Sequence, residues 1–479
     1  MIKELHKKLI NKEITSNDLI IQSLKLSNET QDKINSFVTI LNDAKQEEIT
    51  DSLLSGIPYV AKDNFSTKDI LTTGSSNILK NYVPFFDATA IEKLKKENAV
   101  LIGKTVLDEL AMGGTGTTGH TGIVKNPWNT DRLIGGSSAG SAAAVALGIA
   151  PYALGSDTGD SIRKPAHFGG VVGYKPTYGL ISRFGLFAFA SSLDTVGVFT
   201  RSVEDAAIVT DVLKGKDVRD MTSQETTLKL QESLTGDIKN KKIFYIKELC
   251  NANNFDDSDE EFISILNNFN KTIKNLENLG AIVTEVSVNK DLLKALLPTY
   301  LTISCAEATS NNSNLTGISF GPRADGEKVT DMMFNARTKG FSELIKRRFI
   351  IGSYVLQKEN QEKLFLNAQR IRRIVKDTFT KLFEEYDAVI LPGGSTVAPK
   401  FKSDNIEKMS DRNLMLENHM LIGNFGGFPS ITIPSGFVNN MPVGVNITGP
   451  IFKDDELLNI AFALESTMNF KDQIAGGEK

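Results

Sequence analysis

Residues 135–170 read GGSSAGSAAAVALGIAPYALGSDTGDSIRKPAHFGG, a stretch rich in glycine, serine and alanine. Two Gly/Ser turns, Gly135–Ser138 and Asp157–Ser161, are separated in it by one predicted helix and one predicted strand. Small residues fill a core poorly, but glycines let backbone N–H groups approach a ligand and serines supply hydroxyl nucleophiles. The stretch therefore predicts the floor of an active site.

The elements predicted on either side of this stretch indicate the fold class. Apolar residues recur at helical spacing over residues 3–48 and over Ala88–Asn98. Short apolar runs predict strands at Gly56–Lys62, Val100–Lys104, Tyr152–Gly155, Val171–Tyr174, Lys242–Ile246, Ala281–Val288, Ala388–Leu391, Ser430–Ile433 and Val443–Thr448. Helices and strands that alternate over this length favour an α/β fold, in which helices cover both faces of a sheet.

The domain organisation follows from length and composition. A chain of 479 residues has room for about three domains of ~150 residues, but no stretch has the composition of a linker. The polar stretch Gly215–Lys241 is interpreted as a surface excursion between halves of one sheet, with a domain boundary as the alternative. Gly321–Lys339 and Lys400–Asp411 are interpreted as polar insertions. We expect an N-terminal helical arm over residues 1–50, packed on a single domain over residues 51–479.

Charge and cysteine content narrow the function classes. The net charge of −4 gives no overall basic surface for nucleic acid. The only cysteines, Cys250 and Cys305, lack the spacing of metal ligands, so we expect no metal site, no disulfide framework and a reducing cytoplasm. No apolar run approaches the ~20 residues of a membrane span.

The sequence favours neither a dinucleotide-binding site nor a Ser-His-Asp triad. Gly114–Gly119 matches G-x-G-x-x-G, but a dinucleotide site needs this motif to follow a strand and open a helix, and neither is predicted here. A Ser-His-Asp triad needs a histidine beside an acidic residue. The four histidines are His6 in a surface-like arm, His120 and His167 in Gly-rich turns without an obvious acidic neighbour, and His419. Each of them is interpreted as structural rather than as a base.

A lysine then becomes the candidate base. Lys62 ends an apolar strand, where burial would lower its pKa and free it to accept a proton. Ser137 and Ser161 would supply a bridging and an attacking hydroxyl. The alternatives are an ion pair between Lys62 and Asp63, and serines that only form turns or cap helices.

Several of these motifs resemble the amidase signature family. The resemblance covers nearly the whole chain, and Lys62, Ser137 and Ser161 agree with that family's Ser-cisSer-Lys arrangement. The matching motifs are GIPYVAKDN, ATAIEKLKKENAVLIGKT, DELAMGG, KNPWN, GGSSAGSAAAVALG, LGSDTGDSIRKPAHFGGVVGYKPTYG and SLDTVGVFTRSVEDAA. The later segments ISCAEATSNNS, FSELIKRRFIIGSYVL and NFGGFPSITIP resemble the branch that works in tRNA-dependent amidotransferases.

The resemblance implies an α/β/α sandwich with a large mixed sheet, and it implies roles for individual residues. Ser161 matches the acyl-forming nucleophile, Ser137 the proton bridge and Lys62 the base. The residues whose backbone N–H groups would form the oxyanion hole, with that of Ser161, are Thr158, Gly159 and Asp160. In the tRNA-dependent branch an arginine binds the glutamine carboxylate and an acid binds its amino group. The positions that match these two are Arg348 and Glu417.

The chain departs from the family pattern beside the nucleophile and at three other places. Asp160 stands where the family has glycine, and a carboxylate facing the pocket would oppose a developing oxyanion. The other departures are Ala139 for a common glycine, Thr115-Gly116-Thr117 for a Ser-Thr-Glu segment on the ammonia route, and Glu417 for a shorter aspartate.

The resemblance implies a glutaminase subunit that needs no cofactor of its own. It would pass ammonia to a tRNA-binding partner subunit that activates Glu-tRNA(Gln) or Asp-tRNA(Asn) with ATP and magnesium, and a small subunit would link the two. The alternatives are a stand-alone amidase for a small amide, and a scaffold subunit that Asp160 has impaired.

Overall fold

An 11-stranded mixed sheet forms the centre of the computed structural model, which describes all residues except 46–48, 256–258, 402–409, 469, 471–472 and 477–479. The strand order is β1-β3-β2-β6-β8-β7-β12-β13-β11-β9-β10. The strands of this sheet are β1 (Phe37–Ile40), β2 (Pro58–Lys62), β3 (Val100–Thr105), β6 (Tyr152–Asp157), β7 (Val172–Lys175), β8 (Thr195–Thr200), β9 (Lys242–Ile246), β10 (Ile282–Val286), β11 (Ala388–Pro392), β12 (Ser430–Val438) and β13 (Met441–Thr448). A separate hairpin pairs β4 (Lys125–Asn126) with β5 (Asn129–Leu133).

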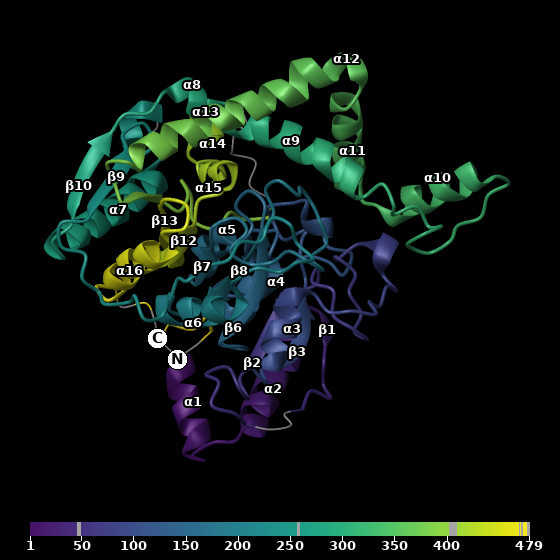
Figure 1. Ribbon diagram of the computed structural model, residues 1–479, viewed down its shortest axis with the longest axis horizontal. Coiled ribbons are helices and arrows are strands. Elements are labelled where there is room, and N and C mark those ends of the chain that lie inside the picture. The colour runs from purple at the N-terminus through teal and green to yellow at the C-terminus, as the bar shows by residue number, and fades with distance from the viewer. Residues whose placement is uncertain (46–48, 256–258, 402–409, 469, 471–472, 477–479) are drawn as a thin grey trace.

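Helices cover the sheet on both sides, as the alternation of elements predicts (Figure 1). The helices are α1 (Ile2–Ile10), α2 (Ser16–Ile34), α3 (Thr89–Lys96), α4 (Ala139–Ala146), α5 (Arg163–Gly169), α6 (Val203–Leu213), α7 (Glu260–Asn278), α8 (Lys290–Lys294), α9 (Leu296–Asn311), α10 (Val329–Gly340), α11 (Glu343–Val355), α12 (Lys358–Gln361), α13 (Asn367–Leu382), α14 (Asp411–Met415), α15 (Leu421–Gly426) and α16 (Asp454–Glu465). No helix among the described residues has both the length and the apolar run that a bilayer crossing requires.

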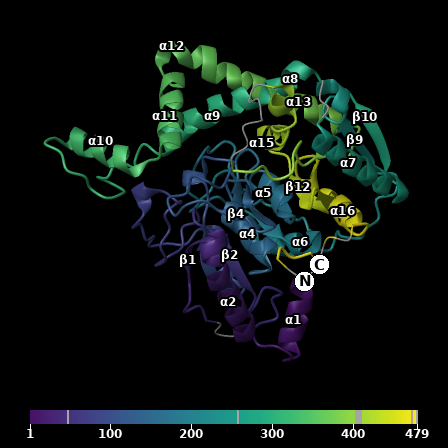
Figure 2. The ribbon, with the colours of Figure 1, turned by 180° about the vertical axis from the view of Figure 1, so that it is seen from behind.

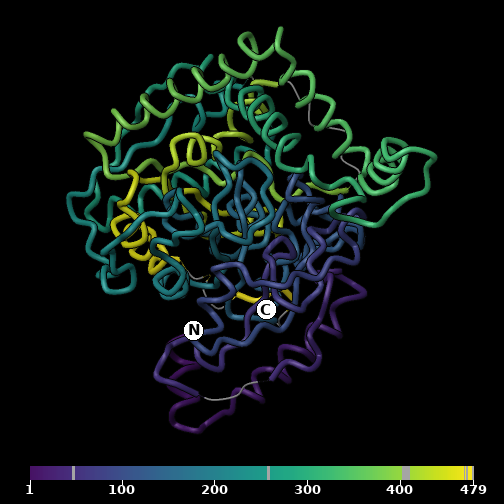
Figure 3. Tube along the Cα trace, turned by 45° about the vertical axis from the view of Figure 1, so that its right-hand side comes forward, coloured from purple at the N-terminus to yellow at the C-terminus, as the bar shows by residue number. Residues whose placement is uncertain are grey.

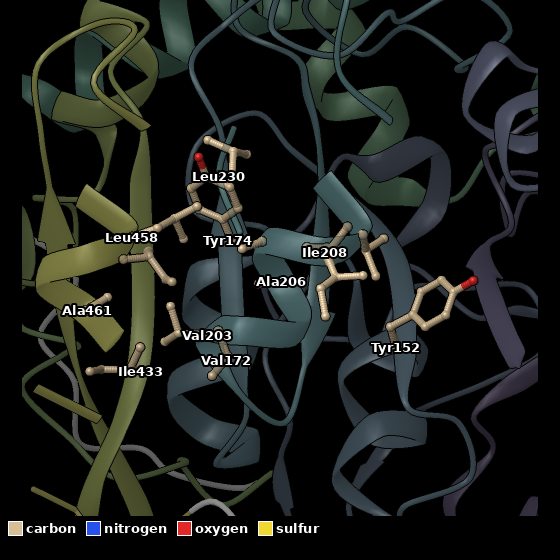
Figure 4. Close-up of a cluster of buried hydrophobic side chains, with 14 of the residues drawn as sticks. Tyr152, Val172, Tyr174, Val203, Ala206, Ile208, Leu230, Ile433, Leu458 and Ala461 are labelled. Atoms are coloured by element: carbon tan, nitrogen blue, oxygen red, sulfur yellow. The ribbon is translucent and has the colours of Figure 1, made fainter. Parts of the chain in front are cut away.

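The central strands are buried on both faces because their side chains alternate between two apolar layers. In β2, Tyr59 and Ala61 face a layer built with α3, α6 and α16, whereas Val60 faces a layer built with α2, α4 and α5. Figure 4 shows the first layer where β7 and β12 pack against α6 and α16. This double burial fixes the register of the central strands, and with it the positions of the turns that follow them.

Different helices lie at the two ends of the molecule. The N-terminal helices α1 and α2 lie at one end of the molecule, and helices α9 to α13 lie at the other (Figures 1 and 3). Helix α10 and its flanking loops project from the body, as the reverse view also shows (Figure 2). This projecting segment lies in the polar insertion predicted at Gly321–Lys339, and most of the Lys400–Asp411 prediction lies outside the described residues.

The predicted strands are confirmed, and two predictions need correction. The helical prediction over residues 3–48 is wrong at β1, which pairs antiparallel with β3. The predicted strands also omitted β8, which joins β6 to β7 at the centre of the sheet. Residues 215–241 contain no helix or strand, and β9, which follows them, belongs to the same sheet as β8.

The buried layer between the sheet and α16 predicts a large stability loss on truncation. Leu458 is fully buried there, so Leu458→Ala should lower the free energy of unfolding by about 2–5 kcal/mol, because it removes packed methyl groups and leaves a cavity. Urea unfolding would measure the change. Ile374→Ala on α13 is the control, since its side chain is 54% exposed and should cost under about 1 kcal/mol. Equal losses in both variants would contradict this account of the core.

Candidate active site

Two adjacent parallel strands bring the predicted residues to one edge of the sheet. Strand β2 ends at Lys62 and strand β6 ends at Asp157, and the two pair in parallel. The turn 158–162 that follows β6 leads directly into α5. Ligand sites of α/β sheets lie at the carboxyl ends of the strands, because the backbone groups of the loops there are not used in strand pairing. The strand order therefore places a lysine next to the turn that carries Ser161.

Lys62 is buried and contacts hydroxyl groups rather than a carboxylate. Its Nζ atom lies 2.7 Å from Ser137 Oγ and 2.9 Å from Ser156 Oγ, and it donates to the Ser156 carbonyl at 3.1 Å. Burial lowers the pKa of Lys62 to about 7, against the opposing charges of nearby aspartates. The alternative ion pair with Asp63 is wrong, because Asp63 faces Lys104 at 3.4 Å.

The turn that carries Ser137 is held from its back. The Gly136–Ser137 peptide is cis, and the Ser137 carbonyl accepts the Asp108 amide at 3.1 Å. The Asp108 carboxylate accepts the amides of residues 115–118 at 2.9–3.2 Å and the Thr118 hydroxyl at 2.9 Å. The glycine-rich motif at Gly114–Gly119 is thus a loop that wraps Asp108, which agrees with its rejection as a dinucleotide site.

The turn that carries Ser161 is built around a buried ion pair. Both oxygens of Asp157 accept from Arg163, at 2.9 Å from Nη2 and 3.1 Å from Nε, and both side chains are fully buried. Asp157 also accepts the Ile162 amide at 2.9 Å. Burial alone would raise the pKa of Asp157, but Arg163 and the other donors lower it. The Ser138 amide donates to the Ser161 carbonyl at 3.2 Å and joins the two turns.

The backbone amides of residues 158–161 point to an anion site. Among the described residues, none of these four amides donates a hydrogen bond to a protein acceptor. Thr158 is fixed through its side chain, whose hydroxyl donates to Asp194 at 2.7 Å. Consecutive N–H groups that lack a protein acceptor, placed beside a serine, could donate hydrogen bonds to the negative oxygen of a tetrahedral intermediate.

Helices α9 and α11 supply the wall above this turn. A Cβ atom on Gly159 would lie 3.1 Å from the Tyr300 ring, so the backbone passes directly beneath that ring. Tyr300 packs edge-on against Phe189 with ring centroids 6.4 Å apart, and the Arg348 guanidinium lies 5.6 Å from the Phe189 centroid. The Nε and Nη1 atoms of Arg348 are buried without an acceptor in the described part of the chain. The wall therefore presents a cation that a carboxylate could bind.

Glu417, the second residue predicted to bind substrate, already has protein partners. Its carboxylate lies 2.8 Å from Lys164 Nζ and accepts from the amide and hydroxyl of Ser395, both at 2.6 Å. Burial favours the neutral acid, but these partners lower the pKa of Glu417 to about 2. Asp160 differs, because its half-buried carboxylate accepts no hydrogen bond from the described residues. Burial raises the pKa of Asp160 to about 6, and Lys164 opposes that rise.

Among the described residues, no histidine side chain hydrogen-bonds to Ser137 or Ser161. Burial lowers the pKa of His167 to about 4 and that of His419 to about 3, so both rings are neutral at pH 7. Within the described residues, no three or more His, Cys, Asp or Glu side chains gather as metal ligands. The residues that sequence reasoning missed are the supports Asp108, Asp157, Arg163 and Ser156. The two aspartates could have been found from their positions after predicted strands. Asp108 follows the end of β3 by three residues, and Asp157 is the last residue of β6.

The comparisons with known proteins agree with this geometry. The family model described as Amidase matches residues 18–458. The A subunit of the glutamyl-tRNA(Gln) amidotransferase of Halothermothrix orenii is 40% identical over 98% of this chain and 97% of its own length. The protein of the same name from Streptococcus sanguinis is also 40% identical, over 100% and 99% of the two chains.

Solved structures show the same fold. The crystal structure of the same amidotransferase component from Thermotoga maritima has a TM-score of 0.81 and 34% identity, and covers 96% of this chain and 94% of that one. The native peptide amidase of Stenotrophomonas maltophilia has a TM-score of 0.80 at 24% identity, with 98% and 96% covered, and shows the fold alone.

The buried pair beneath the turn generates a stability prediction. Asp157→Ala should lower the free energy of unfolding by about 3–5 kcal/mol, because it leaves Arg163 buried without its counter-charge. Asp377→Ala is the matched control, since Asp377 pairs with Arg373 on the exposed face of α13 and should change stability by at most about 1 kcal/mol. Denaturant titration of both variants checks the difference, and similar losses would refute it.

Proposed function

This chain belongs to the amidase family, and we propose that it is the glutamine-hydrolysing component of a glutamyl-tRNA(Gln) amidotransferase. The observation that carries the proposal is the contact of 2.7 Å between Lys62 Nζ and Ser137 Oγ, made by a lysine whose pKa burial lowers to about 7. Such a lysine is neutral in a large fraction of molecules at pH 7 and can act as a general base. The 40% identity to amidotransferase relatives over the full chain supports the choice of substrate.

The proposed reaction begins with proton transfer through the two serines. Neutral Lys62 accepts the proton of Ser137 Oγ, which takes the proton of Ser161 Oγ as that oxygen attacks the side-chain amide carbon of glutamine. The amide oxygen gains the negative charge, and the amides of residues 158–161 donate to it. The proton then returns along the same path to the departing nitrogen. Ammonia leaves, and a glutamyl ester of Ser161 remains for hydrolysis by water.

Arg348 is proposed to bind the α-carboxylate of glutamine. A guanidinium offers two parallel N–H groups that match the two oxygens of a carboxylate. Two of its nitrogens are buried without an acceptor in the described part of the chain, so a bound carboxylate would satisfy them. The wall formed by Tyr300 and Phe189 would then hold the aliphatic part of the substrate against the turn.

The partners belong to the same proposal. A tRNA-binding subunit would use ATP and magnesium to activate Glu-tRNA(Gln), or Asp-tRNA(Asn), and would receive the ammonia, with a small linking subunit and a cytoplasmic location. This division of labour would let a chain with net charge −4 serve a tRNA reaction. We also propose the division into an N-terminal arm over residues 1–50 and one domain over residues 51–479.

The first test is ammonia release from glutamine with and without co-purified partner subunits. Wild-type turnover should rise when the partners are present, and Ser161→Ala should lower kcat by at least about 10⁴-fold, because it removes the attacking oxygen. Turnover of other amides without any dependence on partners would favour a stand-alone amidase. A folded wild-type complex that hydrolyses no amide would favour an impaired scaffold.

The pH dependence tests the role of Lys62. Because the base must be neutral, kcat/KM for glutamine should fall at least about tenfold for each unit below pH 7 and should level off by about pH 8, while the α-amino group of glutamine is still protonated. The apparent pKa of the acidic limb should lie near 7, the value that burial gives Lys62. A rate that keeps rising up to pH 10 would instead indicate a lysine with an ordinary pKa and would contradict the assignment.

A further inference from the structure

We propose that Asp160, rather than Glu417, provides the counter-charge for the α-ammonium group of the glutamine substrate. The inference rests on the proposed function and deepens it, because it names the residue that selects an amino acid over other amides. It reassigns a role that the family resemblance gives to Glu417. The two carboxylates differ in whether protein donors already occupy them.

Glu417 cannot offer an uncompensated charge. It is tied to Lys164 at 2.8 Å and to two donors of Ser395 at 2.6 Å, and its side chain is 17% exposed. A carboxylate that already accepts three hydrogen bonds, one of them from an ammonium, has little attraction left for a second cation. Together Glu417 and Lys164 form a neutral pair.

Asp160 adds the charge that this pair lacks. The charges that act most strongly on it are those of Lys164, Asp157, Arg163 and Glu417. Two cations and two anions cancel among these four, so the five side chains together carry one net negative charge. The Asp160 carboxylate accepts no hydrogen bond from the described residues and is half-buried rather than sealed. A substrate ammonium is a cation that this carboxylate can pair with.

The position of Asp160 suits the geometry of an amino-acid substrate. It directly precedes Ser161, and its charge acts on Tyr300, as does the charge of Arg348. Gly159, which precedes Asp160 in the turn, lies against the Tyr300 ring. Arg348 on α11 lies 5.6 Å from the centroid of Phe189, which packs on Tyr300. A zwitterion needs both charges, with its carboxylate at Arg348 and its ammonium at Asp160. Asp160 is also absent from the residues with positive φ, so its backbone carries no strain of that kind.

The test compares glutamine with glutaramate, which is glutamine without its amino group. Asp160→Asn keeps the shape of the side chain and removes its charge. In the complex with partner subunits, kcat/KM for glutamine should fall about 10- to 100-fold, while kcat/KM for glutaramate should stay the same or rise. Asp377→Asn, on the exposed face of α13, is the matched control and should change neither value.

A double variant tests the charge balance directly. Lys164→Gln in the Asp160→Asn background frees Glu417 from its ammonium partner and restores one net negative charge. The preference for glutamine over glutaramate should then return in part. Equal loss of both substrates in Asp160→Asn would show that Asp160 only shapes the turn, and an unchanged preference would show that it does not meet the ammonium. Either result overturns the inference and leaves the proposed function standing.

The wild-type enzyme gives a measurement that does not depend on how a variant folds. Burial raises the pKa of Asp160 to about 6, whereas Asp157 and Glu417 stay ionised and His167 and His419 stay neutral between pH 5 and 7. Burial also raises the pKa of Asp194 to about 6, but Asp194 accepts the Thr158 hydroxyl and the amides of Phe189 and Ala190, so its protonation acts on the turn and affects both substrates alike. The glutamine-to-glutaramate ratio of kcat/KM should therefore fall as the pH drops from 7 to 5. Protonation of Lys62 affects both substrates and cancels in that ratio. A constant ratio would overturn the inference, and no hydrolysis of either substrate would overturn the proposed function with it.

Discussion

The proposed active site depends on one buried lysine that has hydroxyl partners in place of a carboxylate. Two adjacent parallel strands each place a lysine in the core, Lys62 on β2 and Lys104 on β3. Lys104 faces the Asp63 carboxylate at 3.4 Å and donates to the Phe65 carbonyl at 2.9 Å, which is a structural arrangement. Lys62 faces Ser137 and Ser156, which accept a hydrogen bond but do not hold a positive charge as a carboxylate does. In the proposed mechanism this difference makes Lys62 the base and leaves Lys104 a structural support.

Carboxylates lie behind the two serine turns, where they accept hydrogen bonds from backbone amides and from neighbouring side chains. Asp108 collects the amides of residues 115–118, and Asp157 collects the Ile162 amide together with Arg163. Each fixes one of the two serine turns, and both charges also act on Lys62 without touching it. Because the anions lie behind the turns, they limit how far burial lowers the pKa of Lys62 and do not neutralise it by contact. The same two aspartates, Asp108 and Asp157, therefore hold the serine turns in place and limit how far the pKa of Lys62 falls.

The sequence allowed much of this to be predicted, but not all. Apolar runs located every strand that is buried on both faces except β8. The sequence of β8, TVGVFT, contains threonine and glycine and gives a weaker apolar signal. Strand β1 lies in a stretch whose apolar residues have helical spacing. Lys62 followed from its place at the end of a strand, and Ser137 and Ser161 from their turns and a family resemblance. The contact between Lys164 and Glu417 joins residues 253 positions apart, and no local pattern encodes it. That the Asp160 carboxylate accepts no hydrogen bond from the described residues is equally a property of the folded turn.

A carboxylate beside an oxyanion hole works against catalysis when no cation is bound to it, since it repels the charge that develops on the amide oxygen. Pairing with a substrate ammonium removes that repulsion, because the bound substrate cancels the field of Asp160 before the oxyanion forms. An amide without an amino group would leave the charge in place and would meet a higher barrier at the same serine. Asp160 would then favour glutamine over amides without an amino group in two ways, by binding the substrate and by lowering the barrier to reaction. Differences in transition-state stabilisation are what raise kcat/KM for one substrate over another. On this argument the unusual aspartate is a means of restricting a general amidase site to an amino acid.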